Sequence, residues 1–274
     1  MDGPAGSQKF HLAQSDAVAW LRAFPDDSVD LVITDPPYES LEKHRAIGTT
    51  TRLKHSKASS NDWFAIFPNE RFPELFTEVY RVLRRNSHFY LFCDPETMFV
   101  AKPDAEKAGF KFWKPLIWDK MRIGMGYHYR ARYECVLFFE KGKRKLNDLG
   151  IADIIDAPRI SGGYPAEKPS AVSEVLIRQS TEPGQLVIDP FMGSGSVGVA
   201  AVTHARSFVG NDLCKEAVDI ARGRLREAGA AEVRSMGELV DDGGGDGRGG
   251  GRRGGQLGLA GLAAPEPPDA GGAP

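Results

Sequence analysis

The chain has 274 residues, 41% of them hydrophobic and 26% charged, which is enough for one α/β domain of ordinary size with a core. Its formal net charge of −2 argues neither for nor against a nucleic-acid partner, so local charge clusters have to be examined.

The cysteines and the N-terminus argue against several classes of protein. Cys93, Cys135 and Cys214 lie far apart and form no C-x-x-C pair, so neither a disulfide framework nor a zinc site is indicated, and no metal is expected. We expect buried thiols in a reducing cytosol. The N-terminal MDGPAGSQKF has no apolar h-region, and no apolar run reaches the length of a membrane span. A cytoplasmic protein without membrane contact is therefore expected.

Short apolar runs alternate with helical patterns along the chain. In chain order the pattern predicts a strand over 30–35, a helix over 72–83, a strand over 88–93, a helix over 95–108 interrupted near Pro103, strands over 111–118 and 133–139, a helix over 170–179 with Ser170 as its N-cap, a strand over 185–189, a helix over 194–203, a strand over 207–212 and a helix over 215–227. Strands alternating with helices imply an α/β fold with a largely parallel sheet covered on both faces.

Three segments do not fit this alternation. Residues 39–69 and 142–164 have little apolar period, and long irregular segments of this kind are usually functional or disordered. From about Asp241 the chain is rich in Gly, Pro and Ala and cannot bury enough surface to fold. We therefore expect one domain over residues 1–236, with insertions near 39–69 and 120–164, and a disordered tail over 237–274.

A glycine-rich loop follows the strand that ends at Asp189. Gly193, Gly195 and Gly198 fit the pattern G-x-G-x-x-G between a strand and a helix, which lets a nucleotide approach the backbone closely. Asp212 ends the next strand, at a spacing suited to holding a ribose diol. A glycine turn that merely packs helix on strand is the alternative, but the three features together favour a nucleotide-type cofactor.

The residues around this loop discriminate between cofactors. A dinucleotide fold needs several βα units after the loop, whereas only one more strand and helix follow here before the tail. Asp189 would repel a pyrophosphate but could accept hydrogen bonds from the ammonium group of an amino-acid moiety. S-adenosylmethionine is therefore favoured over a nicotinamide dinucleotide.

The sequence Asp35-Pro36-Pro37-Tyr38 follows the first predicted strand. Two prolines end the strand and stiffen the turn, which presents a carboxylate, carbonyls and an aromatic ring at the ligand-binding edge of an α/β sheet. Asp35 and the Pro36 carbonyl could accept both N–H protons of an aromatic amino group, which frees its lone pair to attack a methyl group. Tyr38 would stack on the base, an interaction of about 1–3 kcal/mol that offsets the cost of extruding it. A purely structural turn with Tyr38 in the core is the alternative.

These two motifs, in this order, resemble the β class of amino-methyltransferases acting on DNA, over residues 10–226. The resemblance implies a Rossmann-like S-adenosylmethionine methyltransferase sheet, circularly permuted so that the catalytic turn precedes the cofactor loop. It implies that the catalytic residues are Asp35, Pro36, Pro37 and Tyr38. It implies that the cofactor contacts Asp16, Asp35, Lys168, Asp189, Pro190, Phe191, Gly193, Ser194, Gly195, Ser196 and Asp212. Departures from the family pattern occur at Tyr164, Ala166, Ser196 and Asp212, none of them in the catalytic turn.

The target base is a finer question. Adenine enzymes of this class usually carry Asp at the first position of the turn, so Asp35 favours site-specific adenine-N6 methylation. A cytosine-N4 enzyme of the same class and a catalytically silent DNA-binding homologue are the alternatives. A nicotinamide oxidoreductase would explain the glycine loop but leave the Pro-Pro turn unexplained.

Basic clusters indicate where double-stranded DNA would bind. The first, directly after the catalytic turn, comprises Lys43, Arg45, Arg52, Lys54 and Lys57. The second contains Arg122 and Arg130, interleaved with Tyr127, His128 and Tyr129. We expect both to contact phosphates, although a solvated loop is the alternative for the first. The family resemblance also implies a bacterial or phage-encoded enzyme, a homodimer and a cognate restriction enzyme.

Overall fold

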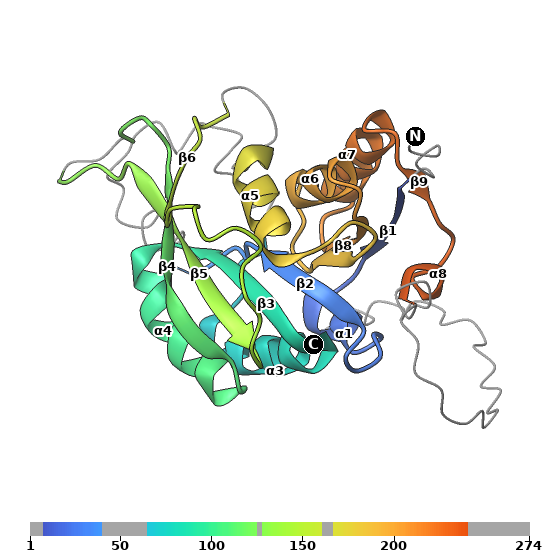
Figure 1. The fold of residues 1–274 in the computed structure, drawn as a ribbon, viewed down its shortest axis with the longest axis horizontal. Helices are drawn as coiled ribbons and strands as arrows, with labels where there is room; N and C mark the ends of the chain where they lie inside the picture. The colour runs from blue at the N-terminus through green and yellow to red at the C-terminus, as the bar shows by residue number, and fades with distance from the viewer. Residues whose placement is uncertain (1–7, 40–64, 125–127, 161–166, 241–274) are drawn as a thin grey trace, which may run out of the picture. The chain divides into compact units, whose positions relative to one another are not determined.

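The computed structural model describes residues 8–39, 65–124, 128–160 and 167–240. The described residues form one nine-stranded sheet, with helices packed on it (Figure 1). Its strands are β1 (Lys9–Gln14), β2 (Val29–Thr34), β3 (Leu83–Cys93), β4 (Lys111–Asp119), β5 (Tyr133–Lys141), β6 (Ile154–Asp156), β7 (Leu186–Asp189), β8 (Ser207–Asp212) and β9 (Ala231–Glu232). The helices are α1 (Ala17–Leu21), η3 (Asn69–Arg71), α3 (Phe72–Val82), α4 (Pro95–Lys107), α5 (Ser170–Ser180), α6 (Ser196–Thr203), α7 (Lys215–Glu227) and α8 (Gly237–Val240).

The sheet is largely parallel, as expected, with one reversed strand. Its order is β6-β4-β5-β3-β2-β7-β8-β1-β9, and β5 runs antiparallel to both of its neighbours. The block β3-β2-β7-β8-β1 is parallel throughout, so its carboxyl ends share one edge. Because β2 lies beside β7, the turn after β2 and the loop after β7 become neighbours although about 150 residues separate them. This arrangement is consistent with the permuted order.

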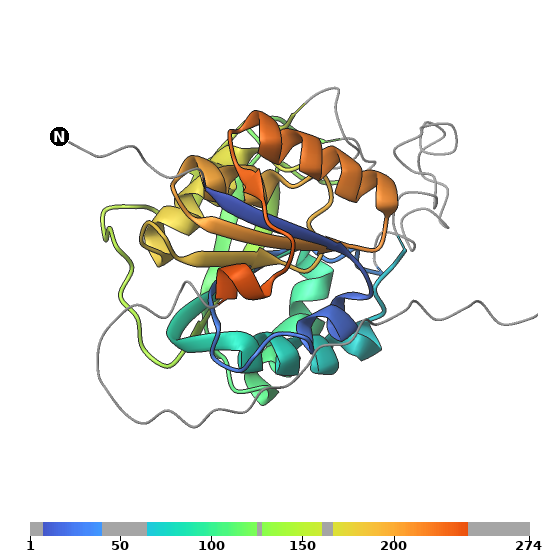
Figure 2. The same ribbon diagram turned by 90° about the vertical axis from the view of Figure 1, so that its right-hand side faces the viewer.

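Two hydrophobic clusters cover the two faces of the sheet. Successive residues of β2 point to opposite faces, so Val32 packs into one cluster while Leu31 and Ile33 pack into the other. Residues of α1, α3 and α4 complete the first cluster, and residues of α5, α6 and α7 complete the second (Figure 2). The prediction of an α/β sheet covered on both faces is confirmed.

Some element predictions were wrong in detail. Helix α4 is continuous through Pro103, because that residue is exposed and water can hydrate the carbonyl group that loses its N–H partner. Ser170 begins α5, but Pro169 occupies the N-cap and no side chain caps the helix. Strand β3 begins at Leu83, five residues before the expected start, where the polar residues gave no apolar period.

Several short elements were not expected, namely β1, α1, η3, β6, β9 and α8. Helix α8 falls in the stretch assigned to the tail, and its Leu239 is buried in the first cluster. The remainder of that stretch, residues 241–274, lies outside the described residues. Of the cysteines, Cys93 and Cys135 are buried and Cys214 is partly buried. None of the described helices combines the length and apolar character required to cross a bilayer.

Candidate active site

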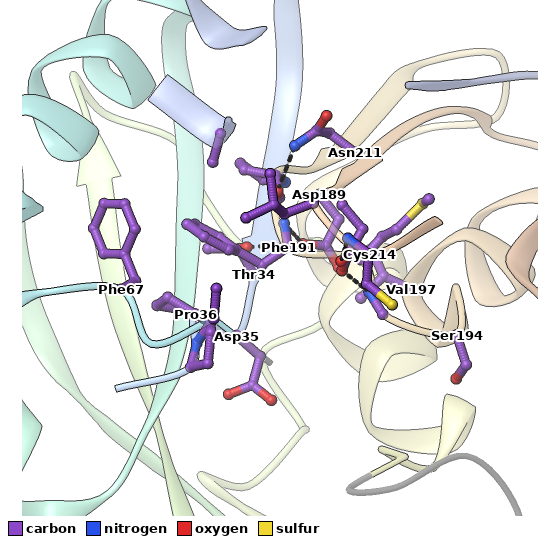
Figure 3. A pocket seen from close by; sticks show the side chains of 18 of the residues that line it. Thr34, Asp35, Pro36, Phe67, Asp189, Phe191, Ser194, Val197, Asn211 and Cys214 are labelled. Atoms are coloured by element: carbon purple, nitrogen blue, oxygen red, sulfur yellow. Dashed lines mark hydrogen bonds between the residues drawn. The ribbon is translucent and has the colours of Figure 1, made fainter. Parts of the chain in front are cut away.

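The parallel block has an unusual concentration of carboxylates along its carboxyl edge. In sheet order, the strands β3, β2, β7, β8 and β1 lead to Asp94, Asp35, Asp189, Asp212 and Asp16. A cavity of about 620 Å³ opens at this edge, and all of these aspartates except Asp94 line it (Figure 3). This volume lies within the usual range for small-molecule sites. The fold therefore places at one site residues that are far apart in the sequence.

The cavity brings together most of the residues singled out from the sequence. Its lining includes all four residues of the Asp-Pro-Pro-Tyr turn. It also includes Asp16, Lys168, Asp189, Pro190, Phe191, Gly193, Ser194, Ser196 and Asp212. Gly195 lies behind the lining at the start of α6, with φ of 79°, and a Cβ there would lie 2.9 Å from the Ala221 Cβ. Gly195 thus permits the close approach of α6 and α7.

The turn after β2 holds its side chains in fixed positions. The Pro37 carbonyl accepts a hydrogen bond from the Phe67 N–H at 2.8 Å, which ties the turn to the segment before η3. Tyr38 is 7% exposed and belongs to the first hydrophobic cluster, yet its ring also lines the cavity. The Asp35 side chain keeps 27% of its surface exposed. The turn thus presents a carboxylate and an aromatic ring to the same space.

The Asp35 carboxylate belongs to a chain of alternating charges. Its Oδ2 accepts a hydrogen bond from Lys168 Nζ at 2.5 Å, and the same ammonium lies 3.2 Å from Glu134 Oε2. Burial raises the pKa of Asp35 above its usual value, and Lys168 opposes that shift. The sequence predicts that Lys168 contacts the cofactor, whereas its position also makes it the cation paired with the turn's carboxylate.

The loop after β7 is held by neutral donors. Asp189 Oδ1 accepts hydrogen bonds from Thr34 Oγ1 at 2.7 Å and from the Phe191 N–H at 3.0 Å. Burial raises the pKa of Asp189 to about 8, which the two hydrogen bonds only partly offset. The Asp189 carboxyl group therefore carries its proton at neutral pH until a cation approaches it.

The ends of β8 and β1 contribute the other two carboxylates. Asp212 accepts from the Gly193 N–H at 2.9 Å and from the Cys214 N–H at 2.8 Å, which joins the glycine loop to the start of α7. Asp16 caps α1 and also pairs with Arg71 through two hydrogen bonds of 2.7 and 3.0 Å. The Arg71 hydrogen bonds lower the pKa of Asp16. All four carboxylates are thus oriented before any ligand binds.

Two buried polar atoms in the cavity wall fit a polar ligand. Ser173 Oγ and Asn211 Oδ1 have no hydrogen-bond partner among the described residues, and both side chains are at most 1% exposed. Buried polar atoms are rarely left unpaired, so such atoms in a cavity indicate a missing ligand or water. Together with the carboxylates and the glycine loop, they suit a ligand with hydroxyl, amino and cationic groups, as S-adenosylmethionine has.

Several residues were not singled out for this site from the sequence. Arg71, Glu134 and Asn211 all line the cavity, but none belongs to a motif with a recognisable spacing. Glu134 alternates with apolar residues at the start of β5, a pattern that indicates only an outward-facing polar position. Only the tertiary contacts reveal its role. No group of His, Cys, Asp or Glu suited to a metal occurs in the part of the chain that the structure describes.

Of the two basic clusters expected to bind DNA, only the basic residues of the second lie among the described residues. Lys43, Arg45, Arg52, Lys54 and Lys57 lie outside the described residues. Arg122 and Arg130 lie on the connection between β4 and β5, and both are exposed. This connection starts beside the ion pairs of Asp35, because Lys120 follows β4 directly and its Nζ lies 2.6 Å from Glu134 Oε1, which belongs to the residue that also pairs with Lys168.

Comparison with known proteins places this chain in one family. The family model described as DNA methylase matches residues 29–161 and 147–223. Among curated proteins, “Putative methylase YubD” of Escherichia coli K12 is 28% identical over 233 residues, covering 84% of this chain and 95% of YubD. “DNA adenine methyltransferase YhdJ” of the same organism is 24% identical over 259 residues, covering 80% of this chain and 84% of YhdJ.

Solved structures share the fold. TTHA0409 of Thermus thermophilus, described as a “Putative DNA Modification Methylase” and complexed with S-adenosylmethionine, has a TM-score of 0.61 and 21% identity, covering 80% of this chain and 94% of that one. The PvuII DNA methyltransferase, described as cytosine-N4-specific, has a TM-score of 0.63 and 17% identity, covering 86% and 93%. Since the family model spans more than half of the sequence, this chain belongs to the N6/N4 family of DNA methylases and is an S-adenosylmethionine-dependent DNA methyltransferase.

Proposed function

We propose that this DNA methyltransferase methylates N6 of an adenine extruded from double-stranded DNA, at a specific sequence. The observation that carries the proposal is the turn after β2, where the Asp35 carboxylate opens into the cavity while Lys168 binds its Oδ2. A carboxyl group paired with a buried ammonium is therefore positioned to accept from an amino group at the edge where the family's methyl donor would bind.

Each residue of the turn has a chemical role in this proposal. Asp35 and the Pro36 carbonyl accept the two N–H protons of the amino group, so its lone pair is withdrawn from the ring and directed outward. Tyr38 provides the apolar face on which the extruded base stacks. S-adenosylmethionine, when bound, supplies the electrophilic sulfonium methyl group.

The remaining cavity residues would hold the methyl donor. Asp189 would accept hydrogen bonds from the ammonium of its amino-acid moiety. That cation would lower the raised pKa of the Asp189 carboxyl group and stabilise its ionised form. Asp212 would hold the ribose diol, and Asp16 would lie near the adenine ring. Pro190, Phe191 and Lys168, with the loop Gly193, Ser194, Gly195 and Ser196, would complete the cradle.

The choice of adenine rests on the side chain at the first position of the turn. Asp35 matches the adenine enzymes of the class, and the relative YhdJ is named a DNA adenine methyltransferase. The structural neighbour from the PvuII system is described as cytosine-N4-specific, so the fold supports either base. Cytosine-N4 methylation is therefore the alternative outcome of the test.

The DNA would approach over the connection between β4 and β5, and the basic cluster Lys43, Arg45, Arg52, Lys54 and Lys57 would also contact its phosphates. Arg122 and Arg130 are exposed on that connection, with the fully exposed Tyr129 between them. Cations flanking an aromatic ring suit phosphates and an unstacked base. Charge reversal of Arg122 and Arg130 should weaken DNA binding and reduce its salt dependence without changing the affinity for S-adenosylmethionine. A homodimer, a cognate restriction enzyme and a cytoplasmic location remain predictions.

The deciding experiment is incubation with S-adenosylmethionine and mixed genomic DNA, followed by nucleoside mass spectrometry. N6-methyladenine that disappears with Asp35→Ala would support both the reaction and the catalytic turn. N4-methylcytosine would keep the mechanism and overturn the base assignment. Tight binding of S-adenosylmethionine without any methylated nucleoside would instead favour the silent DNA-binding homologue.

A further inference from the structure

Four charged side chains form a continuous line from the candidate catalytic turn to the base of the β4–β5 connection. Lys168 Nζ lies 2.5 Å from Asp35 Oδ2 and 3.2 Å from Glu134 Oε2, and Lys120 Nζ lies 2.6 Å from Glu134 Oε1. The signs alternate along the line, and the four side chains are only 14–27% exposed. We call these four residues the charge chain.

The geometry of the charge chain constrains Asp35 more than a single ion pair would. Lys168 binds Oδ2, which leaves Oδ1 as the oxygen directed to a substrate among the described contacts. The ammonium is itself held from the other side by Glu134, and Glu134 is held by Lys120. An ammonium without that second partner could turn away from Asp35, because a lysine side chain has many rotamers.

We propose that Glu134 and Lys120 are positioning residues that act through Lys168 to fix the orientation and the ionisation of Asp35. This inference rests on the proposed function, in which Asp35 accepts a hydrogen bond from the target amino group. Neither residue needs to touch the substrate. The charge chain ends at Lys120, where the candidate DNA-binding connection begins.

The charges along the chain have opposing effects on Asp35. Burial raises its pKa, the Lys168 cation lowers it, the Glu134 anion raises it, and the more distant Lys120 cation lowers it by less. Glu134 itself is kept ionised, because the two lysines outweigh the effect of burial and hold its pKa below the usual value. The ion pair with Lys168 thus opposes the effect of burial on Asp35, and Glu134 limits how far Lys168 lowers the pKa of Asp35.

Other titratable groups also lie near Asp35. Asp189, at the end of the neighbouring strand, interacts with it electrostatically, as do Tyr38 from its own turn and Cys93 from β3. Burial raises the pKa of all three of these groups, so none of them is charged in the acid range. At saturating S-adenosylmethionine, whose ammonium would already be paired with Asp189, the acid limb of kcat/KM for DNA should therefore report on Asp35 and the charge chain.

The test is the pH dependence of kcat/KM for methyl transfer in Glu134→Gln, Lys168→Met and Lys120→Met. Activity requires ionised Asp35, so the acid limb follows its pKa. Glu134→Gln keeps an oxygen that can accept from Lys168 and removes only the charge, so it should move the limb to lower pH by about one unit, the typical effect of one neighbouring charge. Glu134→Leu would release Lys168 from its second partner and should move the limb to higher pH. Lys168→Met should move it to higher pH by a similar amount, and Lys120→Met should move it in the same direction by less.

A matched control distinguishes a change in charge near Asp35 from a disturbance of the β4–β5 connection. The Asp119 side chain pairs with Arg132 at 2.7 Å beside the same strand ends and forms no ion pair with the charge chain among the described residues, so Asp119→Asn should leave the acid limb unchanged. Melting curves would identify any variant that fails to fold. Lys120 is the outermost member of the chain, so its variant keeps the test informative if Lys168→Met does not fold.

The outcomes distinguish this inference from the proposed function. A wild-type protein that methylates no base would overturn the proposed function before any variant is compared. Active variants whose acid limbs stay at the wild-type pH, or a Glu134→Leu limb that moves to lower pH as that of Glu134→Gln does, would overturn the positioning role. A large rise in the Kd for S-adenosylmethionine in Lys168→Met, with an unmoved acid limb, would make Lys168 a cofactor ligand and also overturn it.

Discussion

The turn after β2 and the loop after β7 end neighbouring strands and line the same cavity, but they hold their carboxyl groups in opposite ways. Asp35 is paired with a buried cation and keeps 27% of its side chain exposed. Asp189 is 3% exposed and receives only neutral donors, Thr34 and the Phe191 N–H. One carboxylate has its counter-ion built into the protein, and the other has none among the described residues.

This difference indicates what each site is ready to bind. An ion-paired carboxylate stays ionised and accepts hydrogen bonds from a neutral donor such as an amino group. A buried carboxyl group without a counter-ion binds its proton, with a pKa of about 8, and loses it when a cation arrives. Methyl transfer from a sulfonium compound needs a neutral amino group as acceptor and a cationic methyl donor. Asp35 suits the first and Asp189 suits the second.

The largest effect should come from removing the carboxylate of the β2 turn. Asp35→Asn preserves size but replaces an ionised acceptor with an amide, and it leaves Lys168 without that partner. We expect methyl transfer to fall by about 10³-fold, which corresponds to ~4 kcal/mol of transition-state stabilisation. The affinity for S-adenosylmethionine, measured by calorimetry, should change by less than about threefold. An equal loss of affinity and rate would mean that the two strand ends form one inseparable cofactor site.

The loop after β7 depends on a glycine at its end, where Gly195 leads into α6. Gly195→Ala would place a Cβ 2.9 Å from Ala221 in a residue with φ of 79°. Left-handed strain and overpacking together should cost about 2–3 kcal/mol of unfolding free energy. Gly184 is the matched control, because its φ is 85° but a Cβ there meets nothing within 4 Å. Gly184→Ala should therefore show strain alone, about 1 kcal/mol, and equal losses in the two variants would argue against close packing at Gly195.

The protonation of Asp189 should make the stability of the ligand-free protein depend on pH. The folded protein binds this proton up to about pH 8, whereas the unfolded chain releases it near the ordinary aspartate pKa of 3.8. The folded state therefore binds more protons than the unfolded state in that window, and this group lowers stability as the pH rises through it. Melting temperatures should fall from pH 5 to pH 8 less steeply in Asp189→Asn than in wild type.

Binding of S-adenosylmethionine should show the complementary trend. If its ammonium pairs with Asp189, the wild-type affinity rises with pH toward 8, because the carboxyl group must release its proton first. We expect about tenfold weaker binding in Asp189→Asn near pH 8 and a flatter pH profile. Unchanged affinity at every pH would place the ammonium elsewhere in the cavity.

The same comparison explains how much the sequence could predict. The Asp-Pro-Pro-Tyr turn and the glycine loop were identifiable because their residue types and spacing are set by local backbone requirements. Glu134 and Arg71 were not predicted as site residues, because their partners are distant in the sequence. Glu134 pairs with Lys168, 34 residues away, and Arg71 pairs with Asp16, 55 residues away. Strands β1 and β9 and helix α1 were missed for a different reason, since segments of two to six residues carry too little period to be distinguished from loops.

Asp16 combines the ion pairing seen at Asp35 with the backbone N–H donors seen at Asp189. Its substitution should change the free energy of unfolding least. It is paired with Arg71, as Asp35 is with Lys168, but 42% of its side chain is exposed and it also caps α1. Asp16→Asn keeps an oxygen for the N-cap and loses the ion pair, so we expect a cost of no more than about 0.5 kcal/mol. Asp16→Ala also removes the cap and should cost about 1 kcal/mol more. Because Arg71 lowers the pKa of Asp16, the ion-pair contribution is present above the unfolded pKa and is lost as the pH falls through the folded one. Chemical unfolding at pH 7 and pH 3 would check this, and an Asn variant as unstable as the Ala variant would show that the charge on Asp16 matters more than its cap.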